Sequence, residues 1–249
     1  MNTPDIRRVR HELKRRVLNV QRVQHLTPKM VRVTVGGDEL AGFTSLGFDD
    51  HVKLFFPDAE GQTARRDFTP RRYDADRAEL VIDFALHDSG PATRWASTAA
   101  AGMTLAVGGP RGSSIIPMEL DSHLLVGDET ALPAIGRRLE ELPGTTRVWV
   151  VAEIDNESER QTFSSSACFD VIWVYRRGGA AGSADALLQA LRTLSVPTTG
   201  CFAWIAAESN VARRLRQFLV EERGLEKPWV KAAGYWQRGV VGAHDRIGD

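Results

Sequence analysis

The pattern of apolar residues changes near residue 118, and this change restricts the folds open to the chain. From about residue 15 to 115, short runs of β-branched and aromatic residues alternate with Gly, Pro and Asp. Such spacing is typical of strands joined by turns and predicts a small antiparallel β-barrel. Strands are expected at 17–23, 30–35, 52–56, 80–86 and 103–107, and one helix is expected from Pro91 to about Ala101.

Beyond residue 118, apolar strands alternate with segments of helical period, which predicts a parallel sheet with helices on both faces. The chain should therefore be an α+β protein of two domains, an N-terminal antiparallel β-barrel at 1–118 and an α/β parallel-sheet domain at 119–249. Strands are expected at 124–126, 148–151, 171–175 and 202–206, helices at 131–142 and 184–194, a helix capped by Ser209, and a last strand from near Val230 to Trp236.

The charges balance overall but not locally. The formal net charge is zero, so long-range attraction to nucleic acid or to an acidic membrane is not indicated. Residues 7–32 are the exception, because they carry nine basic residues against the single acid Glu12. This segment fits a solvated face or the wall of an anion site, and less readily a nucleic-acid or membrane patch. The nine are Arg7, Arg8, Arg10, Lys14, Arg15, Arg16, Arg22, Lys29 and Arg32.

Cys168 and Cys201 are the only cysteines, too few for a disulfide framework, a zinc site or an iron–sulfur cluster. Any redox chemistry is therefore expected to use an organic cofactor and no bound metal. The N-terminal residues lack the apolar core of a signal peptide, and no run approaches a membrane span. We expect a cytoplasmic monomer that neither inserts into membranes nor binds nucleic acid.

The segment Gly127–Pro133 directly follows the first expected strand of the second half and opens a helix. Unpaired backbone N–H groups and the positive helix end favour an anion there, such as a nucleotide phosphate. The segment is not a dinucleotide fingerprint, because Glu129 stands where the second Gly belongs. An ordinary strand-to-helix turn capped by Thr130 accounts for it equally well.

The segment His87–Ala96 also follows an expected strand and opens a helix, so it offers a second helix N-terminus to an anion. Gly90 forms a turn and Pro91 suits the first helical position, which leaves the N–H groups of Ala92 and Thr93 to bind an acceptor. His87 is a further hydrogen-bonding candidate. For Trp95, packing in the core is the favoured interpretation.

The segment Arg66–Asp74, RDFTPRRYD, combines charges, aromatic rings and a proline. In a strand, Asp67, Thr69 and Arg71 would project to one side, and Arg66 and Phe68 to the other. Pro70 indicates that regular pairing is lost just after Thr69. A guanidinium, a hydroxyl and an aromatic edge suit a planar ring with carbonyl and imide groups, and a charged hairpin turn fits the residues equally well.

RDFTPRRYD resembles the Arg-x-Tyr-Thr-x-Arg flavin motif of the siderophore-interacting proteins, a branch of the ferredoxin-reductase-like flavoproteins. Two departures from the family pattern stand out, since Phe68 replaces the usual Tyr and Ala207 replaces an expected Gly. The similarity continues in the family's order through His87-x-x-Gly90-Pro91-Ala92-x-x-Trp95-Ala96, Gly109–Gly112, Gly127–Pro133 and Gly234-Tyr235-Trp236-x-Arg238-Gly239.

The resemblance implies an FAD-binding barrel, an NAD(P)H-binding sheet domain and an oxidoreductase that reduces ferric siderophores, releasing Fe(II) for iron assimilation. NAD(P)H gives two electrons together and Fe(III) accepts one, so a flavin must mediate. No catalytic acid, base or nucleophile is required at the iron. A flavin reductase with a different acceptor and a non-catalytic siderophore-binding protein remain alternatives.

Several roles follow from this resemblance. Arg66, Phe68 and Thr69 would hold the flavin. If the donor is NADPH, Arg176 and Arg177 after the strand at 171–175 are the best candidates to bind its 2′-phosphate, and solvated loop arginines account for them equally well. Glu153 favours the unphosphorylated ribose of NADH instead. The candidate cofactor-binding residues are Arg66, Asp67, Phe68, Thr69, Arg71, His87, Asp88, Gly90, Pro91, Ala92, Thr93, Trp95, Gly127, Asp128, Glu129, Thr130, Glu153, Arg176, Arg177, Glu208, Tyr235 and Trp236. The candidate siderophore-binding residues are Lys53, Lys231, Arg238, His244 and Arg246, although surface solubility accounts for these basic residues equally well.

Overall fold

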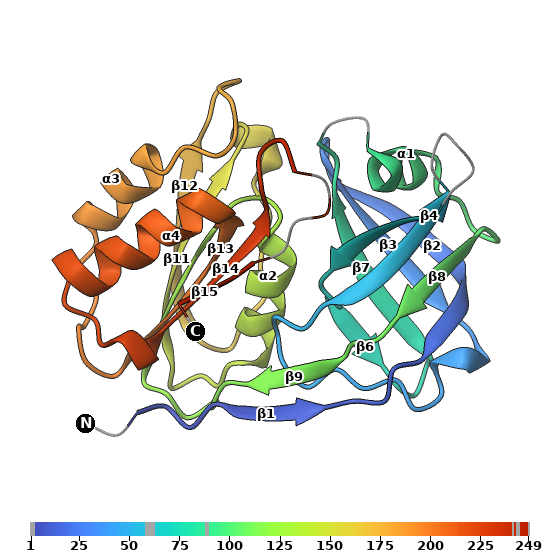
Figure 1. Cartoon of the computed structure of the whole chain (residues 1–249), viewed down its shortest axis with the longest axis horizontal. Coiled ribbons are helices and arrows are strands. Elements are labelled where there is room, and N and C mark those ends of the chain that lie inside the picture. Colours follow the sequence, from blue (N-terminus) through green and yellow to red (C-terminus); the bar gives the residue numbers. More distant parts are fainter. Residues whose placement is uncertain (1–2, 58–62, 88–89, 241, 243–244, 249) are drawn as a thin grey trace. The chain divides into compact units, whose positions relative to one another are not determined.

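A computed structural model describes residues 3–57, 63–87, 90–240, 242 and 245–248 (Figure 1). The chain divides into two compact units, Ile6–Ile116 and Pro117–Asp249, the latter joined by the N-terminal segment Met1–Asp5. Each unit has its own sheet and its own apolar core. None of the helices within the described ranges has the length and apolarity of a transmembrane helix.

The described part of unit Ile6–Ile116 contains a seven-stranded antiparallel sheet with the order β5-β4-β8-β2-β3-β7-β6. Strands β1 (Arg7–Arg10) and β9 (Gly112–Ile115) form a separate antiparallel pair, and helix α1 spans Pro91–Thr98. The seven strands are β2 (Arg15–Thr27), β3 (Met30–Gly36), β4 (Val52–Pro57), β5 (Thr63–Phe68), β6 (Arg72–Asp74), β7 (Glu79–Ala85) and β8 (Thr104–Gly108).

The sheet curves around its core almost to closure. Strand β5 is at one edge and β7 lies near the other, yet the rings of Phe68 and Phe84 are only 4.6 Å apart. Alternate residues such as Val33, Leu54 and Ile82 are fully buried on the inner face, as the period of two requires. The predicted antiparallel barrel is confirmed.

Some boundaries differ from the sequence prediction. Strands β1, β6 and β9 were not expected, because each has only three or four residues and none shows an alternating apolar run. The predicted end of the first helix is wrong, since Ala99 is already extended, with φ −59° and ψ 133°.

In unit Pro117–Asp249 the described residues form a six-stranded sheet with the order β12-β11-β10-β13-β14-β15. Five strands are parallel, and β15 (Asp245–Ile247) is antiparallel to β14. The parallel strands are β10 (Ser122–Gly127), β11 (Arg147–Ile154), β12 (Cys168–Tyr175), β13 (Cys201–Glu208) and β14 (Val230–Trp236).

Three α-helices cover the two faces of this sheet. Helix α2 (Leu132–Glu141) lies on one face, and α3 (Asp185–Thr193) and α4 (Ser209–Gln217) lie on the other (Figure 1). The chain runs outward from β10 to β12 and returns to β13 on the other side of β10, so the strand order reverses there. This confirms the predicted parallel sheet, and such a reversal is where open α/β sheets bind ligands.

Gly127 permits the close packing of this region. A Cβ atom at this position would lie 2.4 Å from both the Ala131 Cβ and the Ala206 carbonyl oxygen. Neither atom belongs to a flexible side chain, so no larger residue fits where β10 turns into α2.

The predicted cap of α4 is wrong. The Glu208 carboxylate accepts hydrogen bonds from the backbone N–H groups of Asn210 at 2.7 Å and Val211 at 3.1 Å. Ser209 is instead the first helical residue, and its hydroxyl donates to the Trp236 carbonyl at 3.2 Å. A carboxylate at the N-cap satisfies the same unpaired amides that a Ser side chain would.

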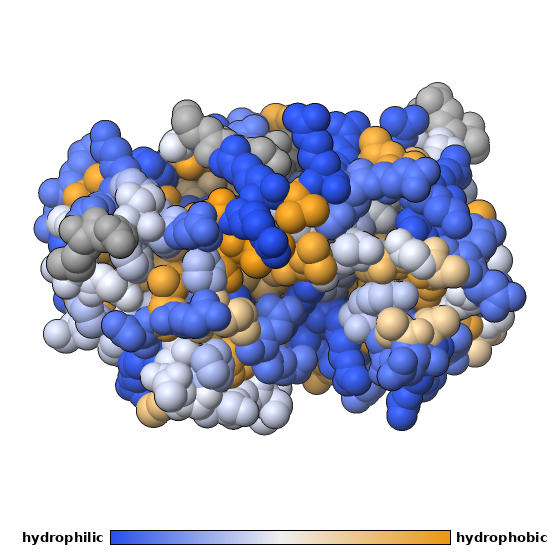
Figure 2. Space-filling view, turned by 90° about the horizontal axis from the view of Figure 1, so that it is seen from below, coloured by the Kyte–Doolittle hydropathy of each residue, from blue (hydrophilic) through white to orange (hydrophobic). Residues whose placement is uncertain are grey.

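The basic segment 7–32 does not form one uniform surface. Arg16 is buried and donates to the Glu39 carbonyl at 2.8 Å, and Arg32 pairs with Asp83. Arg7, Arg8 and Arg10 are exposed on β1. The face in Figure 2 carries hydrophilic residues over much of its area, with hydrophobic patches between them. Arg16 and Arg32, and also Arg22 through its pair with Glu79, thus have structural partners inside the barrel unit.

His123 of β10 is fully buried, and within the described ranges neither ring nitrogen has a hydrogen-bond partner. Burial, reinforced by the positive charge of Arg138, lowers its pKa to about 3. Because the unfolded state then binds a proton more readily than the folded state, stability falls as pH decreases from about 6.5 toward 3.

The stability of the protein relative to a His123→Phe variant should therefore fall by about 2 kcal/mol between pH 7.5 and pH 5. Urea unfolding at the two pH values measures this difference. Subtracting the variant removes the contributions of all other titrating groups. If the free energies of unfolding of the protein and of His123→Phe differed by the same amount at both pH values, the lowered pKa of His123 would be contradicted.

Candidate active site

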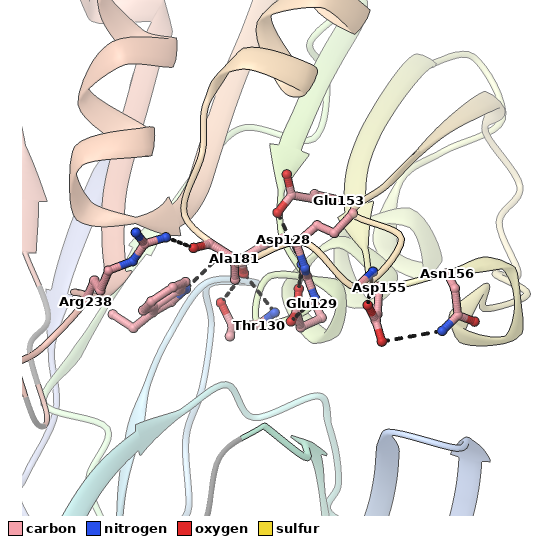
Figure 3. Close-up of polar contacts among 11 residues, drawn as sticks. Asp128, Glu129, Thr130, Glu153, Asp155, Asn156, Ala181 and Arg238 are labelled. Carbon is pink, nitrogen blue, oxygen red and sulfur yellow. Dashed lines mark hydrogen bonds and ion pairs between the residues drawn. The ribbon is translucent and has the colours of Figure 1, made fainter.

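The turn after β10 joins distant strands at the carboxyl end of the parallel sheet (Figure 3). Asp128 is buried, and its Oδ1 accepts hydrogen bonds from the Thr130 backbone N–H at 2.9 Å and hydroxyl at 2.5 Å. Its Oδ2 accepts a hydrogen bond from the Trp236 indole N–H at 2.8 Å. Asp128 therefore links the end of β10 to the end of β14.

Glu129, the next residue, extends toward the other side of the sheet. Its carboxylate accepts two hydrogen bonds from the Arg176 guanidinium, at 2.6 and 2.7 Å. The same guanidinium donates to Glu153 at 3.2 Å. Arg176 follows β12 and Glu153 lies near the end of β11, so one arginine connects the ends of three neighbouring strands.

The environment of Asp128 favours its protonated form. Burial raises its pKa to about 6, and the charge of Glu129 adds to this effect. Hydrogen bonds from Thr130 and Trp236 act in the opposite direction and limit the shift. Asp128 can therefore change its charge near neutral pH.

Glu153 is affected in the same way. Burial raises its pKa to about 7, although the hydrogen bond and charge of Arg176 oppose the shift. Burial would lower the pKa of Arg176, but its hydrogen bonds and ion pairs with Glu129 and Glu153 prevail and place it above the ordinary value. Because the folded-state pKa of Glu153 is raised, its contribution to stability is present at acid pH and is lost as pH rises through about 7.

Thr130 does not cap helix α2. The N-cap residue is Ala131, and within the described structure no side chain caps it. The Thr130 backbone N–H is already used by Asp128. The turn that the sequence assigns to a phosphate is therefore lined by two carboxylates, Asp128 and Glu129.

Arg177 is placed differently from Arg176. It is exposed, it has a positive φ of 51°, and its backbone N–H donates to the Asp155 carbonyl at 2.8 Å. The Asp155 carboxylate accepts a hydrogen bond from the Gly178 N–H at 3.3 Å and from the Asn156 side chain at 3.4 Å (Figure 3). This loop presents the Arg177 side chain to solvent.

A second group of contacts surrounds Glu208 at the ends of β13 and β14. Glu208 accepts a hydrogen bond from the Arg238 backbone N–H at 3.3 Å, and the Arg238 guanidinium donates to the Ala181 carbonyl (Figure 3). A Cβ atom on Gly182 would lie 3.2 Å from that guanidinium and 3.5 Å from the Trp236 ring. The loop 178–183 is thus attached to the segment that follows β14.

The segment Arg66–Asp74, which resembles the flavin-binding motif, lies in the barrel unit. Arg66 and Phe68 are paired across the strand with the buried residues Leu54 and Val52, which places them on the inner face of β5. The Arg66 guanidinium donates to the Arg65 carbonyl at 2.8 Å, and none of the described carboxylates pairs with it. This cation at the inner face fits an anionic, ring-bearing group.

The residues after Phe68 leave the strand. Asp67 pairs with the exposed Lys53 at 2.7 Å on the outer face. Thr69 and Arg71 are buried, and Arg71 lies 3.8 Å from Asp83. Pro70 follows the end of β5 by two residues, in agreement with the predicted loss of pairing.

Helix α1 contributes further candidate groups. Its N-cap is Gly90, and within the described ranges no side chain caps its first amides. Thr93 donates through its hydroxyl to the carbonyl of His87 at 2.7 Å, while the His87 side chain is exposed. Trp95 packs against the rings of Phe56 and Phe84, at 5.7 and 5.5 Å. Asp88, also predicted to bind a cofactor, lies outside the described residues.

The predicted siderophore-binding residues are not all described. His244 lies outside the described residues, and Arg246 belongs to β15. Lys231 is half-buried in β14, and Arg238 holds the loop carbonyl of Ala181. Lys53 belongs to the barrel unit and is paired with an acid.

Two residues near the strand ends pack inside the fold. The Tyr235 ring meets the buried Trp204 edge-on at 6.1 Å. Ala207, which replaces an expected Gly, is buried in the apolar core that α3 and α4 cover. The extra methyl group therefore occupies space in the core.

The sequence interpretation missed Asp83 and Arg32. Asp83 is buried, accepts two hydrogen bonds of 2.7 Å from Arg32, and lies near Arg71. A single acid within the apolar run Leu-Val-Ile-Asp-Phe was the available signal, because a buried carboxylate requires a partner. The link between Asp128 and Trp236 had no such signal, since 108 positions separate the two residues.

Two family models and several known reductases are similar to this chain in sequence. The model of the family described as siderophore-interacting protein matches residues 120–239, and that of the siderophore-interacting FAD-binding domain matches residues 19–65 and 58–114. The NADPH-dependent ferric-chelate reductase of Escherichia coli is 35% identical over 94% of this chain and 98% of that protein. Ferric vibriobactin reductase ViuB of Vibrio cholerae is 29% identical over 90% of each chain.

Solved structures agree with these matches. A siderophore utilization protein from T. fusca superimposes with a TM-score of 0.90 and 39% identity, covering 97% of this chain and all of that one. A ferredoxin NADP+ reductase from Neisseria gonorrhoeae has a TM-score of 0.56 at 14% identity and covers 84% of this chain and 91% of that one. The latter similarity shows the ferredoxin-reductase-like fold alone.

Proposed function

Since this chain belongs to the siderophore-interacting protein family, we propose that it is a flavoprotein reductase that transfers electrons from NAD(P)H through FAD to a ferric siderophore and releases Fe(II). The observation that carries the proposal is the Arg66 guanidinium on the inner face of β5, beside Phe68 and without a carboxylate partner among the described residues. Arg66 is partly exposed, so its guanidinium can meet an anionic ligand that enters at this face.

Bound FAD would accept electrons in pairs and pass them on singly, which matches a nicotinamide donor and a ferric acceptor. Arg66 would neutralise negative charge on the bound group, and Thr69 would supply a hydroxyl. The first amides of α1, at Ala92 and Thr93, would accept the pyrophosphate. Phe68 keeps the aromatic surface of the family motif without its hydroxyl. Residues 1–118 would form this FAD-binding domain.

The NAD(P)H-binding domain would comprise residues 119–249, with the nucleotide at the carboxyl end of the parallel sheet. Asp128 and Thr130 shape the turn after β10, and Glu208 marks the end of β13. Glu153 and Arg177 are the candidates to contact the ribose and its phosphate. These residues would bind and orient the nucleotide without taking part in proton transfer.

Basic side chains would bind the ferric siderophore, because such chelates are often anionic. Lys231 near the beginning of β14, Arg238 just after its end, and Lys53 on β4 are the described candidates. We further propose that no protein acid or base acts at the iron, since electron transfer alone reduces it.

Anaerobic turnover of the FAD-loaded protein tests the function. NADPH or NADH should bleach the flavin absorption, and addition of ferric siderophores should restore it while an Fe(II)-specific chromogenic chelator reports the released iron. A preparation that does not take up FAD would refute the proposal. Flavin reduction without Fe(II) formation from any iron chelate would support a reductase with a different acceptor. Tight siderophore binding without NAD(P)H oxidation would support a binding protein.

A further inference from the structure

Arg176, the arginine expected to bind a 2′-phosphate, is already occupied by protein carboxylates. Its Nη1 and Nη2 atoms both donate to Glu129, at 2.6 and 2.7 Å, and Nη1 also donates to Glu153 at 3.2 Å. Bidentate pairing of this kind uses the same edge of a guanidinium that a phosphate would use. Arg176 therefore cannot bind a phosphate through this edge while Glu129 remains in place.

The charges around Arg176 also oppose a phosphate. Glu129, Glu153 and the adjacent Asp128 supply three carboxyl groups against one guanidinium. A phosphate that approached this group would meet an excess of negative charge at low solvent exposure, where repulsion is stronger than in water. Burial raises the pKa of Asp128 and of Glu153, which lessens the repulsion without removing it.

The two acids that pair with Arg176 differ in accessibility. The Glu129 side chain is 21% exposed, whereas that of Glu153 is 5% exposed. Glu129 lies in the turn before α2, and Glu153 lies within β11. Glu129 is thus the carboxylate that an incoming group can displace, and Glu153 is the fixed anchor of Arg176.

We propose that Glu129 sets the nucleotide specificity of this chain, by occupying the guanidinium of Arg176 and so disfavouring a 2′-phosphorylated nucleotide. This inference rests on the proposed nucleotide site at the sheet end. It assigns Glu129 the role of a specificity-determining residue, with Arg176 as the group it masks. Contact with a 2′-phosphate in the unmodified chain then depends on the exposed Arg177.

Substitution of Glu129 by Gln tests the proposal. Isothermal titration calorimetry on the FAD-loaded full chain gives the Kd of NADP+ and of NAD+, which differ only in the 2′-phosphate. E129Q should lower the Kd of NADP+ by at least about tenfold, because a charge-assisted pair becomes available, while the Kd of NAD+ changes by less than about twofold. E222Q is the matched control, since Glu222 is exposed and pairs with Arg192 at 3.8 Å.

A double variant, E129Q with R176Q, separates the role of Arg176 from a general loss of negative charge. The gain for NADP+ should disappear in it. A gain that persists there, or a gain of equal size for NAD+, overturns the proposal. If the double variant does not fold, the Kd values of E129Q alone test the proposal: tighter binding of NADP+ without tighter binding of NAD+ supports it, and equal changes overturn it. Failure of the unmodified chain to bind either nucleotide would instead refute the proposed function.

Discussion

Replacement of Arg66 by Ala should weaken FAD binding by roughly 10- to 150-fold, the loss expected for one hydrogen bond to a charged group of 1.5–3 kcal/mol. Arg66 lies on the inner face of β5, and none of the described acids neutralises it. Its removal would leave negative charge on the flavin without its cation, which should also lower the flavin reduction potential. Flavin fluorescence during titration and a potentiometric titration measure the two effects.

Arg65→Ala is the matched control for Arg66. Arg65 is the preceding residue of the same strand, points to the other face, and lies over the Phe55 ring at 5.9 Å. Arg72→Ala is a second control, because Arg72 is exposed and pairs only weakly with Asp74, at 3.5 Å. Both variants should retain FAD. Unchanged FAD retention and potential in Arg66→Ala would refute the assignment of Arg66 as a flavin contact.

Replacement of Asp83 by Ala should destabilise the barrel unit by about 3–5 kcal/mol, the cost of breaking a buried ion pair. Asp83 is buried and pairs bidentately with Arg32, and Arg71 lies 3.8 Å away. The variant leaves two guanidinium groups without this carboxylate. Because Arg71 closely follows Phe68 and Thr69, FAD retention should fall together with stability.

Urea unfolding of Asp83→Ala, followed by the near-ultraviolet signal of the aromatic residues, measures this loss. The control is Glu79→Gln, because Glu79 pairs bidentately with Arg22, whose side chain is 59% exposed. An exposed pair of this kind contributes about 0–1 kcal/mol. If both variants lost the same small amount of stability, Asp83 would not be a structural centre of the barrel.

The unit Pro117–Asp249 shows which structural features a sequence pattern can predict. The apolar runs at 148–151 and 202–206 predicted buried parallel strands, and β11 and β13 contain them. Such runs are local, because burial on both faces of a strand imposes apolar residues at successive positions. The cap of α4 was not predictable in the same way, since Glu208 and Ser209 are both able to cap and only the end of β13 decided between them.

The candidate site residues show the same distinction between local and long-range features. The residue types at the strand ends, Glu129, Glu153 and Arg176, were identified from sequence because turns after parallel strands meet at one edge of a sheet. Their pairing was not, because a guanidinium can pair with a carboxylate or bind a phosphate, and the residue type is the same in both cases. The bidentate contact with Glu129 distinguishes the two roles.

The sequence alone determined the two-part architecture, the order of the longer strands and of the helices, and the family resemblance, because these depend on periodicity and on motifs read over short distances. Only the tertiary structure decided which charged and polar groups pair with one another. Asp83 was joined to Arg32, and Asp128 to Trp236, across 51 and 108 positions. Such pairs depend on which strands become neighbours, and burial then makes each unpaired charge too costly to leave alone.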